Sequence, residues 1–308
     1  MKKIVGFLGM LAMLLFAVQA QAVQLGLYSE GALVPSVIHD GGSIDTVVGI
    51  ICQMDCTQHL SGNPTPQMKV HWTFFDVDSK HVTDGDIVCT DDDLVGFSWK
   101  ASSGRGLENV EGYLVFHAQN DQRTNYQISA NAFLVDQAKK DAIFVPVIPL
   151  TTNDFAGAPR TEPDTITALT NGIHHGQSFD VRYWIDPTYQ AATTIVVWLV
   201  DPYTDSKGKA IPMTVNAWND NEQRKSITIS LPHELNKICP GTIQGMPADF
   251  VDGFISMAMP ATIDGFAYSY ISSTLFGAQQ TLLAAECGRT GGNPAPPRNN
   301  PPCGCVQP

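Results

Sequence analysis

Apolar and polar residues alternate along most of this chain with a period of two, which is the pattern of β-strands with one buried face. In residues 69–74 the apolar side chains point one way and the polar side chains the other, and residues 181–185 and 227–231 repeat this alternation. Further strands are predicted at 44–51, 86–98, 111–118, 126–135, 142–148, 193–200, 211–218, 250–259 and 265–276. Asp-Gly, Gly-Gly and Asp-Pro pairs between them are typical of turns, so the pattern predicts an all-β fold of antiparallel strands.

Two sequence similarities within the chain indicate a tandem repeat. Residues 70–76 resemble residues 196–201, and residues 110–114 resemble residues 251–255, in the same order. We therefore expect two antiparallel β-sandwich domains of immunoglobulin-like architecture. The expected divisions are a signal peptide at 1–22, domain 1 at 23–150, a linker at 151–176, domain 2 at 177–288 and a tail at 289–308. A short helix is predicted within the linker, near residues 163–170.

The beginning of the chain predicts export. Lys2 and Lys3 precede an uncharged apolar run from Ile4 to Val18, and Ala20-Gln21-Ala22 has the small-x-small pattern of a signal-peptidase site. This run is too short to span a bilayer, and no later segment is long enough. We expect a mature chain without a transmembrane segment in the periplasm, outside the cell or at the cell surface.

The end of the chain is rich in proline and glycine and has no bulky apolar residue before Val306. Such a segment buries too little surface to order itself, so a disordered Pro-rich tail is predicted at 289–308. Cys303 and Cys305 lie in this tail. They could bridge each other, remain reduced, or form an intermolecular disulfide with another chain or a surface.

Charge narrows the choice of partners. The chain has 18 Lys and Arg against 30 Asp and Glu, a formal charge of −12, and removal of Lys2 and Lys3 with the leader brings the mature charge to −14. A phosphate backbone would be repelled, so no nucleic acid is expected. The expected partner is another protein or an envelope component.

The cysteines predict disulfides, because exported chains fold in oxidising compartments. The seven are Cys52, Cys56, Cys89, Cys239, Cys287, Cys303 and Cys305, an odd number that leaves at least one without a partner in the chain. Proximity in sequence suggests Cys239 with Cys287 and one pair among Cys52, Cys56 and Cys89. Spacing alone does not fix the connectivity.

Residues 52–59 form the first candidate metal site. Cys52, Cys56 and His59 supply two thiolates and an imidazole, ligands suited to copper. The spacing resembles the binuclear copper loop of cytochrome oxidase subunit II, but the His comes one residue early and Gly62 replaces the Met of that loop. The alternative is that Cys52 forms a structural disulfide.

A cluster of acids forms the second candidate metal site. Asp76, Asp78, Asp84 and Asp86 alternate around a turn that contains Gly85, and carboxylates spaced in this way can converge on calcium. The alternative is a solvated hairpin, because Lys80 and His81 interrupt the cluster and its spacing departs from the EF-hand loop.

The strand face on which each aromatic residue lies predicts what its ring contacts. Trp72 and Trp198 lie on apolar faces and are expected in the cores. Trp184 lies opposite its strand's apolar face, and Tyr268 and Tyr270 share one face, so these rings are expected to cover a second sheet or the neighbouring domain.

The sequence motifs leave enzymatic activity undecided, with the balance favouring a non-catalytic protein. The chain has no Gly-x-Ser-x-Gly, His-Glu-x-x-His, phosphate-binding loop or dinucleotide fingerprint. We therefore expect an exported binding or assembly protein of the envelope or cell surface. The alternatives are an exported copper-handling protein and a secreted hydrolase whose acids include Asp84, Asp86 or Asp91.

Overall fold

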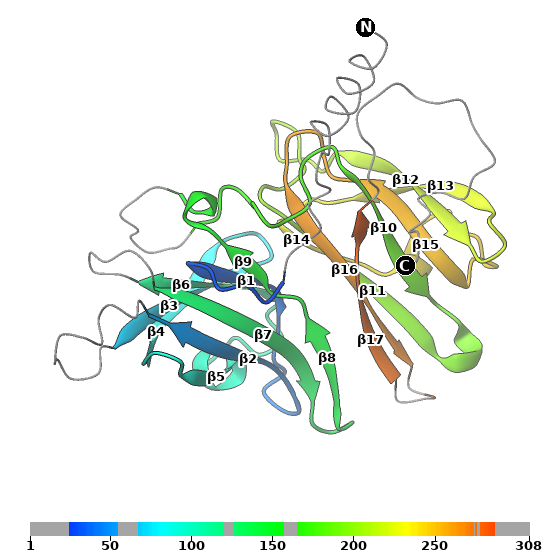
Figure 1. The fold of residues 1–308 in the computed structure, drawn as a ribbon. Helices are drawn as coiled ribbons and strands as arrows, with labels where there is room; N and C mark the ends of the chain where they lie inside the picture. The colour runs from blue at the N-terminus through cyan, green and yellow to red at the C-terminus, as the bar shows by residue number, and fades with distance from the viewer. Residues whose placement is uncertain are drawn as a thin grey trace, which may run out of the picture.

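The computed structural model describes residues 25–54, 67–119, 126–156, 165–273, 275 and 278–286. Of the described residues, 55% are in strands and 6% in helices, and the strands form several antiparallel sheets (Figure 1). The prediction of an all-β fold is therefore confirmed. The leader and the Pro-rich tail lie outside the described residues, as do Cys56, His59, Cys287, Cys303 and Cys305.

The N-terminal half forms a five-stranded sheet of order β4-β3-β6-β1-β9 and a four-stranded sheet of order β5-β2-β7-β8. A single α-helical turn, α2, follows β5, and a 3₁₀ helix, η2, follows β9. The bounds are β1 (Gly31–Val37), β2 (Ile44–Gln53), β3 (Met68–Asp76), β4 (His81–Cys89), β5 (Leu94–Ser98), α2 (Trp99–Ser102), β6 (Gly112–Gln119), β7 (Gln127–Asp136), β8 (Asp141–Val145), β9 (Ile148–Leu150) and η2 (Thr152–Asp154).

The C-terminal half forms a five-stranded sheet of order β13-β12-β15-β10-β18 and a four-stranded sheet of order β14-β11-β16-β17. Two 3₁₀ helices, η3 and η4, lie between strands. The bounds are β10 (Ser178–Trp184), η3 (Pro187–Tyr189), β11 (Ala191–Leu199), β12 (Pro212–Asn219), β13 (Arg224–Ser230), β14 (Leu235–Ile238), η4 (Pro240–Thr242), β15 (Asp252–Ala258), β16 (Gly265–Ser273), β17 (Ala278–Leu283) and β18 (Ala285–Glu286).

The two halves have the same strand order: adding nine to each strand number of the first half gives the second half. A matching side-chain contact fixes the correspondence of residues. The Thr46 hydroxyl bonds to both the backbone N (3.0 Å) and O (2.9 Å) of Ile38, and the Thr193 hydroxyl bonds to the same two atoms of Trp184 (2.7 and 2.8 Å). Thr46 in β2 therefore corresponds to Thr193 in β11.

The hairpins β3–β4 and β12–β13 provide a second match. Asp76 Oδ1 accepts hydrogen bonds from the backbone N–H groups two and four residues later, and Asn219 Oδ1 does the same. The residue three positions on, Ser79 or Glu222, has a φ of 60° in both turns. Asx-type turns of this kind are a known use of Asp and Asn, so Asp76 corresponds to Asn219.

One of the two sequence similarities matches this correspondence and the other does not. Residues 110–114 and 251–255 lead into the equivalent strands β6 and β15, where Gly112 and Gly253 pair with Asp76 and Asn219. Residues 70–76 and 196–201 lie in β3 and β11, which are not equivalent, because β3 corresponds to β12. The alignment of residues 70–76 with residues 196–201 was therefore wrong. Any two half-buried strands have a similar alternation of apolar and polar residues, so this pattern alone does not identify equivalent strands.

In the N-terminal half, aromatic side chains fill the space between the two sheets. The Trp72 ring from β3 lies 5.5 Å from the Phe97 ring of β5, and the Phe97 ring lies 5.3 Å from the Phe116 ring of β6. A buried disulfide, Cys52–Cys89, joins β2 to β4 and therefore joins the two sheets. One disulfide among Cys52, Cys56 and Cys89 was predicted from sequence.

The strand order differs from that of immunoglobulin domains, in which the first two strands share a sheet. Here β1 belongs to the five-stranded sheet and β2 to the four-stranded sheet. The immunoglobulin-like label is therefore not confirmed. Residues 86–98, predicted as one strand, are divided by the turn between β4 and β5.

The linker is held by a buried carboxylate. Asp154 accepts hydrogen bonds from the backbone N and hydroxyl of Thr151 and of Thr170, at 2.7 to 3.0 Å. Its neighbour Phe155 forms an isolated β-bridge with Ile166. The helix predicted near 163–170 is absent from the described residues 165–170. These residues pair instead with the preceding segment through the bridge between Ile166 and Phe155.

The two halves meet between the outer face of the sheet β14-β11-β16-β17 and the outer face of the sheet β4-β3-β6-β1-β9. The ring of Trp198 lies 5.5 Å from that of Tyr113, and both side chains are buried. The Tyr113 hydroxyl donates to Glu234 Oε2 (2.5 Å), and Lys237 Nζ donates to Glu111 Oε1 (2.8 Å). Trp198, expected in its own core, therefore contributes to the contact between halves.

Two further features extend this contact. Tyr268 shares the Trp198 face of its sheet and is buried, as expected for a ring that covers a neighbouring unit. Strand β17 of the C-terminal half lies beside β8 of the N-terminal half (Figure 1). The outer face of the five-stranded N-terminal sheet is consequently covered, whereas Leu94 and Phe133 on the outer face of the four-stranded N-terminal sheet are exposed.

Candidate functional site

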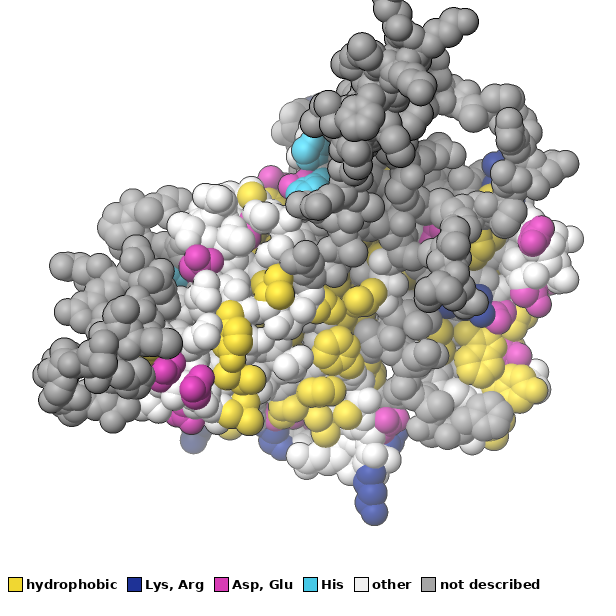
Figure 2. Space-filling view, in the orientation of Figure 1, with side chains coloured by type: hydrophobic (Ala, Val, Ile, Leu, Met, Phe, Trp, Pro, Cys, Tyr) yellow, Lys and Arg dark blue, Asp and Glu magenta, His cyan; other side chains and the backbone are white. Residues whose placement is uncertain are grey.

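The outer face of the sheet β5-β2-β7-β8 presents apolar side chains to solvent. We call this set the apolar face: Val47, Ile51, Leu94, Phe133, Val135 and Phe144. Leu94 is 67% exposed and Phe133 is 41% exposed. Figure 2 shows hydrophobic side chains gathered over β2, β7 and β8. Contiguous exposed apolar patches of this kind mark interaction surfaces in soluble proteins.

Strand register places these residues together. Ile51 pairs with Leu94 on β5, and Val47 pairs with Phe133 on β7. The alternate residues of β2, including Val48 and Ile50, point into the core and are buried. Residues 47–51 are thus apolar on both faces of the strand, which is the sequence signal that could have identified this face.

The middle of the apolar face is flat. Gly49 and Gly96 are directly opposite one another on β2 and β5. A Cβ placed on Gly96 would meet no atom within 4 Å, so no neighbouring side chain requires a glycine there. A flat, open sheet surface with an apolar border suits contact with another folded surface better than binding of a small molecule.

The margin of this face is acidic and hydrogen-bonded to the neighbouring strand. Asp92 and Asp93 are exposed in the turn immediately before Leu94. Asp45 accepts hydrogen bonds from the Ser98 hydroxyl (2.6 Å) and from the backbone N of Lys100 (2.8 Å), which ties β2 to the start of α2. At the other end of β5, the backbone N of Asp92 donates to Cys52 O (2.9 Å) and the backbone N of Cys52 donates to Asp93 O (3.0 Å), so both ends of this edge strand are hydrogen-bonded to β2.

A second surface of interest is the outer face of the sheet β13-β12-β15-β10-β18, which we call the aromatic face. Trp218 and Phe254 stack at 6.0 Å between ring centroids, and the Arg224 guanidinium lies 5.7 Å from the Trp218 ring centroid. Arg182 forms an ion pair with Asp252 at 2.6 Å. Both aromatic rings are half-buried, and the strands around them are largely polar on this side.

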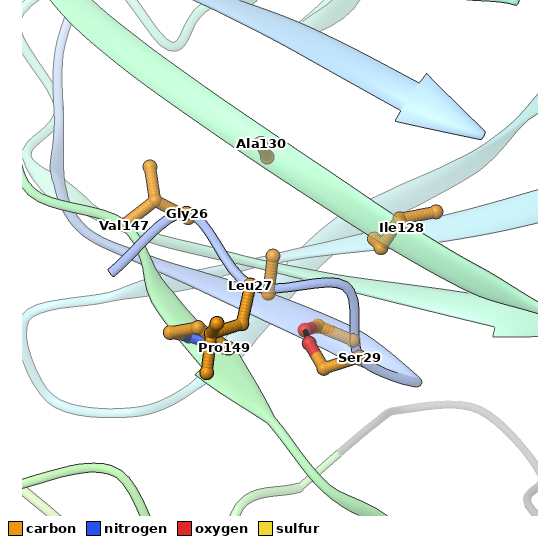
Figure 3. Close-up of a pocket in the computed structure, with 9 residues that line it drawn as sticks. Gly26, Leu27, Ser29, Ile128, Ala130, Val147 and Pro149 are labelled. Atoms are coloured by element: carbon orange, nitrogen blue, oxygen red, sulfur yellow. Dashed lines mark hydrogen bonds between the residues drawn. The ribbon is translucent and has the colours of Figure 1, made fainter. Parts of the chain in front are cut away.

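A small hollow lies between the segment before β1, strand β7 and the approach to β9 (Figure 3). Leu27, Ile128, Ala130, Val147 and Pro149 line it. Ligand pockets usually measure about 300–1,000 Å³ and place polar groups around the ligand. This hollow is too small to admit a water molecule, so it is not our candidate site.

The structure bears directly on one ligand of the copper hypothesis. Cys52 is oxidised in the disulfide with Cys89, so it has no thiolate to offer a metal in this state. Cys56 and His59 lie outside the described residues. Cys239 is exposed, and the only disulfide among the cysteines that the structure describes is Cys52–Cys89.

The four acids of the calcium hypothesis have separate partners. Asp76 caps its own turn, and Asp78 pairs with His233 at 2.8 Å. Asp84 pairs with His81 at 3.0 Å. Within the described ranges, no group of three or more His, Cys, Asp or Glu side chains is arranged to hold a metal. This geometry gives the calcium hypothesis no support.

The acids of the hydrolase hypothesis also have different partners. Asp86 pairs with Lys69 (2.7 Å) and with buried His71 (3.0 Å). Burial by itself raises the pKa of the Asp86 carboxyl, but the contacts with Lys69 and His71 outweigh burial, so the pKa is lowered overall. Asp91 Oδ1 accepts a hydrogen bond from the backbone N of Met54 at 2.7 Å. The last contact holds the chain next to the disulfide, which is a structural role.

His174 and His175, in the linker, both face Asp264. The backbone N and Nδ1 of His175 lie 2.7 and 2.8 Å from Asp264 Oδ1, and His174 Nδ1 lies 3.6 Å from Oδ2. Burial raises the pKa of Asp264, and the His175 hydrogen bonds outweigh it and lower the pKa. This contact joins the linker to the turn before β16.

Comparison with known proteins adds no assignment: no protein-family model, no curated protein and no solved structure matches this chain. In the part of the chain that the structure covers, no helix is long and apolar enough to cross a bilayer.

Proposed function

We propose that this chain is an exported, non-catalytic protein of two tandem β-sandwich domains that acts in binding or assembly at the cell envelope or surface. The observation that carries the proposal is the apolar face, where Leu94 and Phe133 are exposed on a flat sheet. Keeping such a surface in water costs roughly 25 cal/mol for each Å² of apolar area left unburied, so a partner that covers it gains that free energy.

The duplicated strand order supports the domain assignment. Each half has its own pair of sheets, and every sheet uses strands from one half only. The N-terminal segment supports export, because residues 1–22 have the pattern of a cleaved leader. Sequencing the secreted or envelope-bound protein should find Val23 at its N-terminus, whereas an intact Met1 end on the exported chain would argue against a cleaved leader.

The binding role is tested with the immobilised mature chain and an envelope extract of the cells that produce it. Leu94→Gln with Phe133→Gln makes the apolar face polar, and Val88→Gln is the matched control, because Val88 is 57% exposed on β4, outside that face. We expect the wild-type chain and the control to retain the same component and the double variant to lose it. Equal retention by all three chains would remove the apolar face from the proposal.

A further inference from the structure

The apolar face corresponds to the surface through which the C-terminal half packs on the N-terminal half. Ile51 and Trp198 are equivalent, because each lies five residues after an equivalent threonine, Thr46 or Thr193. Ile51 pairs with Leu94 and Trp198 pairs with Leu235, so Leu94 and Leu235 are equivalent as well. Trp198 and Leu235 are 0% and 2% exposed, whereas Leu94 is 67% exposed. The same positions are thus covered in one half and open in the other.

The surface that receives this contact also has a counterpart. In the N-terminal half, Phe75 and Tyr113 stack at 5.1 Å under the C-terminal half. The register of the equivalent strands places Trp218 and Phe254 at the same two positions in the C-terminal half, again stacked. The aromatic face is therefore the open equivalent of a surface that the chain already uses for packing.

We propose that the apolar face of one copy of this chain docks on the aromatic face of a second copy and repeats the contact between the two halves. This inference rests on the proposed function, because it names the partner of the apolar face. The contact joins two different surfaces, so each added copy leaves one of each open, and the assembly grows head to tail. It would continue the series of equivalent units that the two halves begin.

Charge supports the pairing of these two faces. Asp93 occupies the place of Glu234, which accepts the Tyr113 hydroxyl in the internal contact. Phe254 has no hydroxyl, but Arg224 lies over its stacking partner Trp218. In the proposed contact, the exposed Asp93 carboxylate takes the place of the Glu234 acceptor, and the exposed Arg224 guanidinium replaces the Tyr113 hydroxyl as the donor. Opposite charges on the two faces favour oriented docking.

A second internal ion pair supplies a test that depends on the sign of charge. Lys237 bonds to Glu111 across the halves. Gly96 is the counterpart of Lys237, because each lies two residues after an equivalent leucine, Leu94 or Leu235. Asp252 is the counterpart of Glu111, because each immediately precedes an equivalent glycine, Gly253 or Gly112. Gly96→Lys would place a cation opposite Asp252 of the next copy, and Gly96→Glu would place an anion there.

The first experiment measures the mass of the mature chain by sedimentation equilibrium from about 1 μM to about 1 mM, a range that covers interfaces of modest affinity. We expect the mass to rise with concentration for the wild type. Gly96→Glu should weaken association by about tenfold or more, and Gly96→Lys should leave it unchanged or strengthen it. An equal loss of association in both variants would indicate non-specific apolar contact and would overturn the proposed pairing.

The second experiment mixes two variants that each lack one face: Leu94→Glu, and Trp218→Ala with Phe254→Ala. Each alone should be monomeric, and the mixture should form one-to-one dimers and nothing larger, because only one intact face of each kind remains free to pair. If either variant alone still dimerises, the contact joins like faces and the head-to-tail arrangement is wrong. Unchanged far-ultraviolet circular dichroism and a retained cooperative melting transition show that both variants fold.

A wild-type chain that remains monomeric up to about 1 mM would overturn self-association. The envelope-capture experiment then separates the two proposals. If Leu94→Gln with Phe133→Gln still loses its captured component, the apolar face serves a different partner and the proposed function stands without this inference.

Discussion

The indole of Trp198 and the phenol of Tyr113 meet edge to face across the contact between the two halves, with 5.5 Å between ring centroids and 79° between ring planes. Both side chains are almost wholly buried. Edge-to-face aromatic pairs contribute roughly 0.5–1.5 kcal/mol beyond the area that they bury. The contact thus has the character of a core, and its loss should be felt in the stability of both halves.

Replacing Trp198 by Ala should lower the free energy of unfolding by about 3–5 kcal/mol, since a large buried ring is removed and a cavity remains. The matched control is Ile51→Ala at the equivalent position on the apolar face, which should cost less than about 1 kcal/mol in the monomer. Chemical denaturation at low protein concentration measures both. Similar costs for the two variants would mean that the equivalent positions are equally covered.

Glu234→Gln should change how stability depends on pH. Burial raises the pKa of the Glu234 carboxyl, although its hydrogen bonds to Tyr113 and Ser79 lower it in part. The folded state therefore favours the protonated acid, and the wild type loses stability as pH rises from the ordinary value of 4.5 through the raised pKa. Gln retains an acceptor for Tyr113 but does not ionise.

The stability of Glu234→Gln relative to the wild type should consequently increase between pH 4 and pH 7. Urea unfolding at a series of pH values measures this difference. Glu222→Gln is a control, because Glu222 is exposed on a hairpin turn. A relative stability of Glu234→Gln that stays constant with pH would show that Glu234 ionises normally at the contact.

Two equivalent glycines should tolerate no side chain. A Cβ at Gly112 would lie 2.0 Å from the Phe75 carbonyl oxygen, and a Cβ at Gly253 would lie 1.8 Å from the Trp218 carbonyl oxygen. Each Gly→Ala change should lower the free energy of unfolding by about 1–3 kcal/mol or more, because backbone must move. Gly96→Ala, which meets nothing within 4 Å, should be neutral or slightly stabilising. Thermal unfolding of the three variants checks the order.

Removing the disulfide should destabilise the N-terminal half. Cys52 and Cys89 are 37 residues apart, and a loop of that length closed by a disulfide is worth about 4 kcal/mol through the entropy of the unfolded chain. Cys52→Ala with Cys89→Ala should lose about that much. Peptide mapping without reduction should recover the Cys52–Cys89 pair from the native protein, and a Cys52–Cys56 pair in its place would contradict the structure.

Strand alternation was enough to predict the class of fold and most of the strands. It failed where local signals conflict with tertiary context. Strand β1 contains Pro35, which usually argues against a strand, yet β1 lies inside the five-stranded sheet with an irregular register between Val34 and Val37. Residues 86–98 were predicted as one strand, although the turn at Asp91–Asp93 divides them into β4 and β5.

The site was harder to predict because it depends on which sheet faces remain open. Trp198 and Ile51 are both outward-facing apolar residues of equivalent strands, and sequence alone does not distinguish them. Only the packing of one half on the other covers Trp198 and leaves Ile51 and Leu94 accessible. The candidate metal residues gave clear sequence signals, but Asp76, Asp78 and Asp84 have local partners that their spacing did not reveal.

Hydrogen exchange of the mature chain at low and high concentration tests the central claim most directly. The account predicts that the edge strands β5 and β13, which border the two proposed contact faces, gain protection together as concentration rises. Strand β4, at the edge of the sheet covered within the chain, should not change. Protection that appears on only one of the two faces, or on neither, would contradict head-to-tail association through the apolar and aromatic faces.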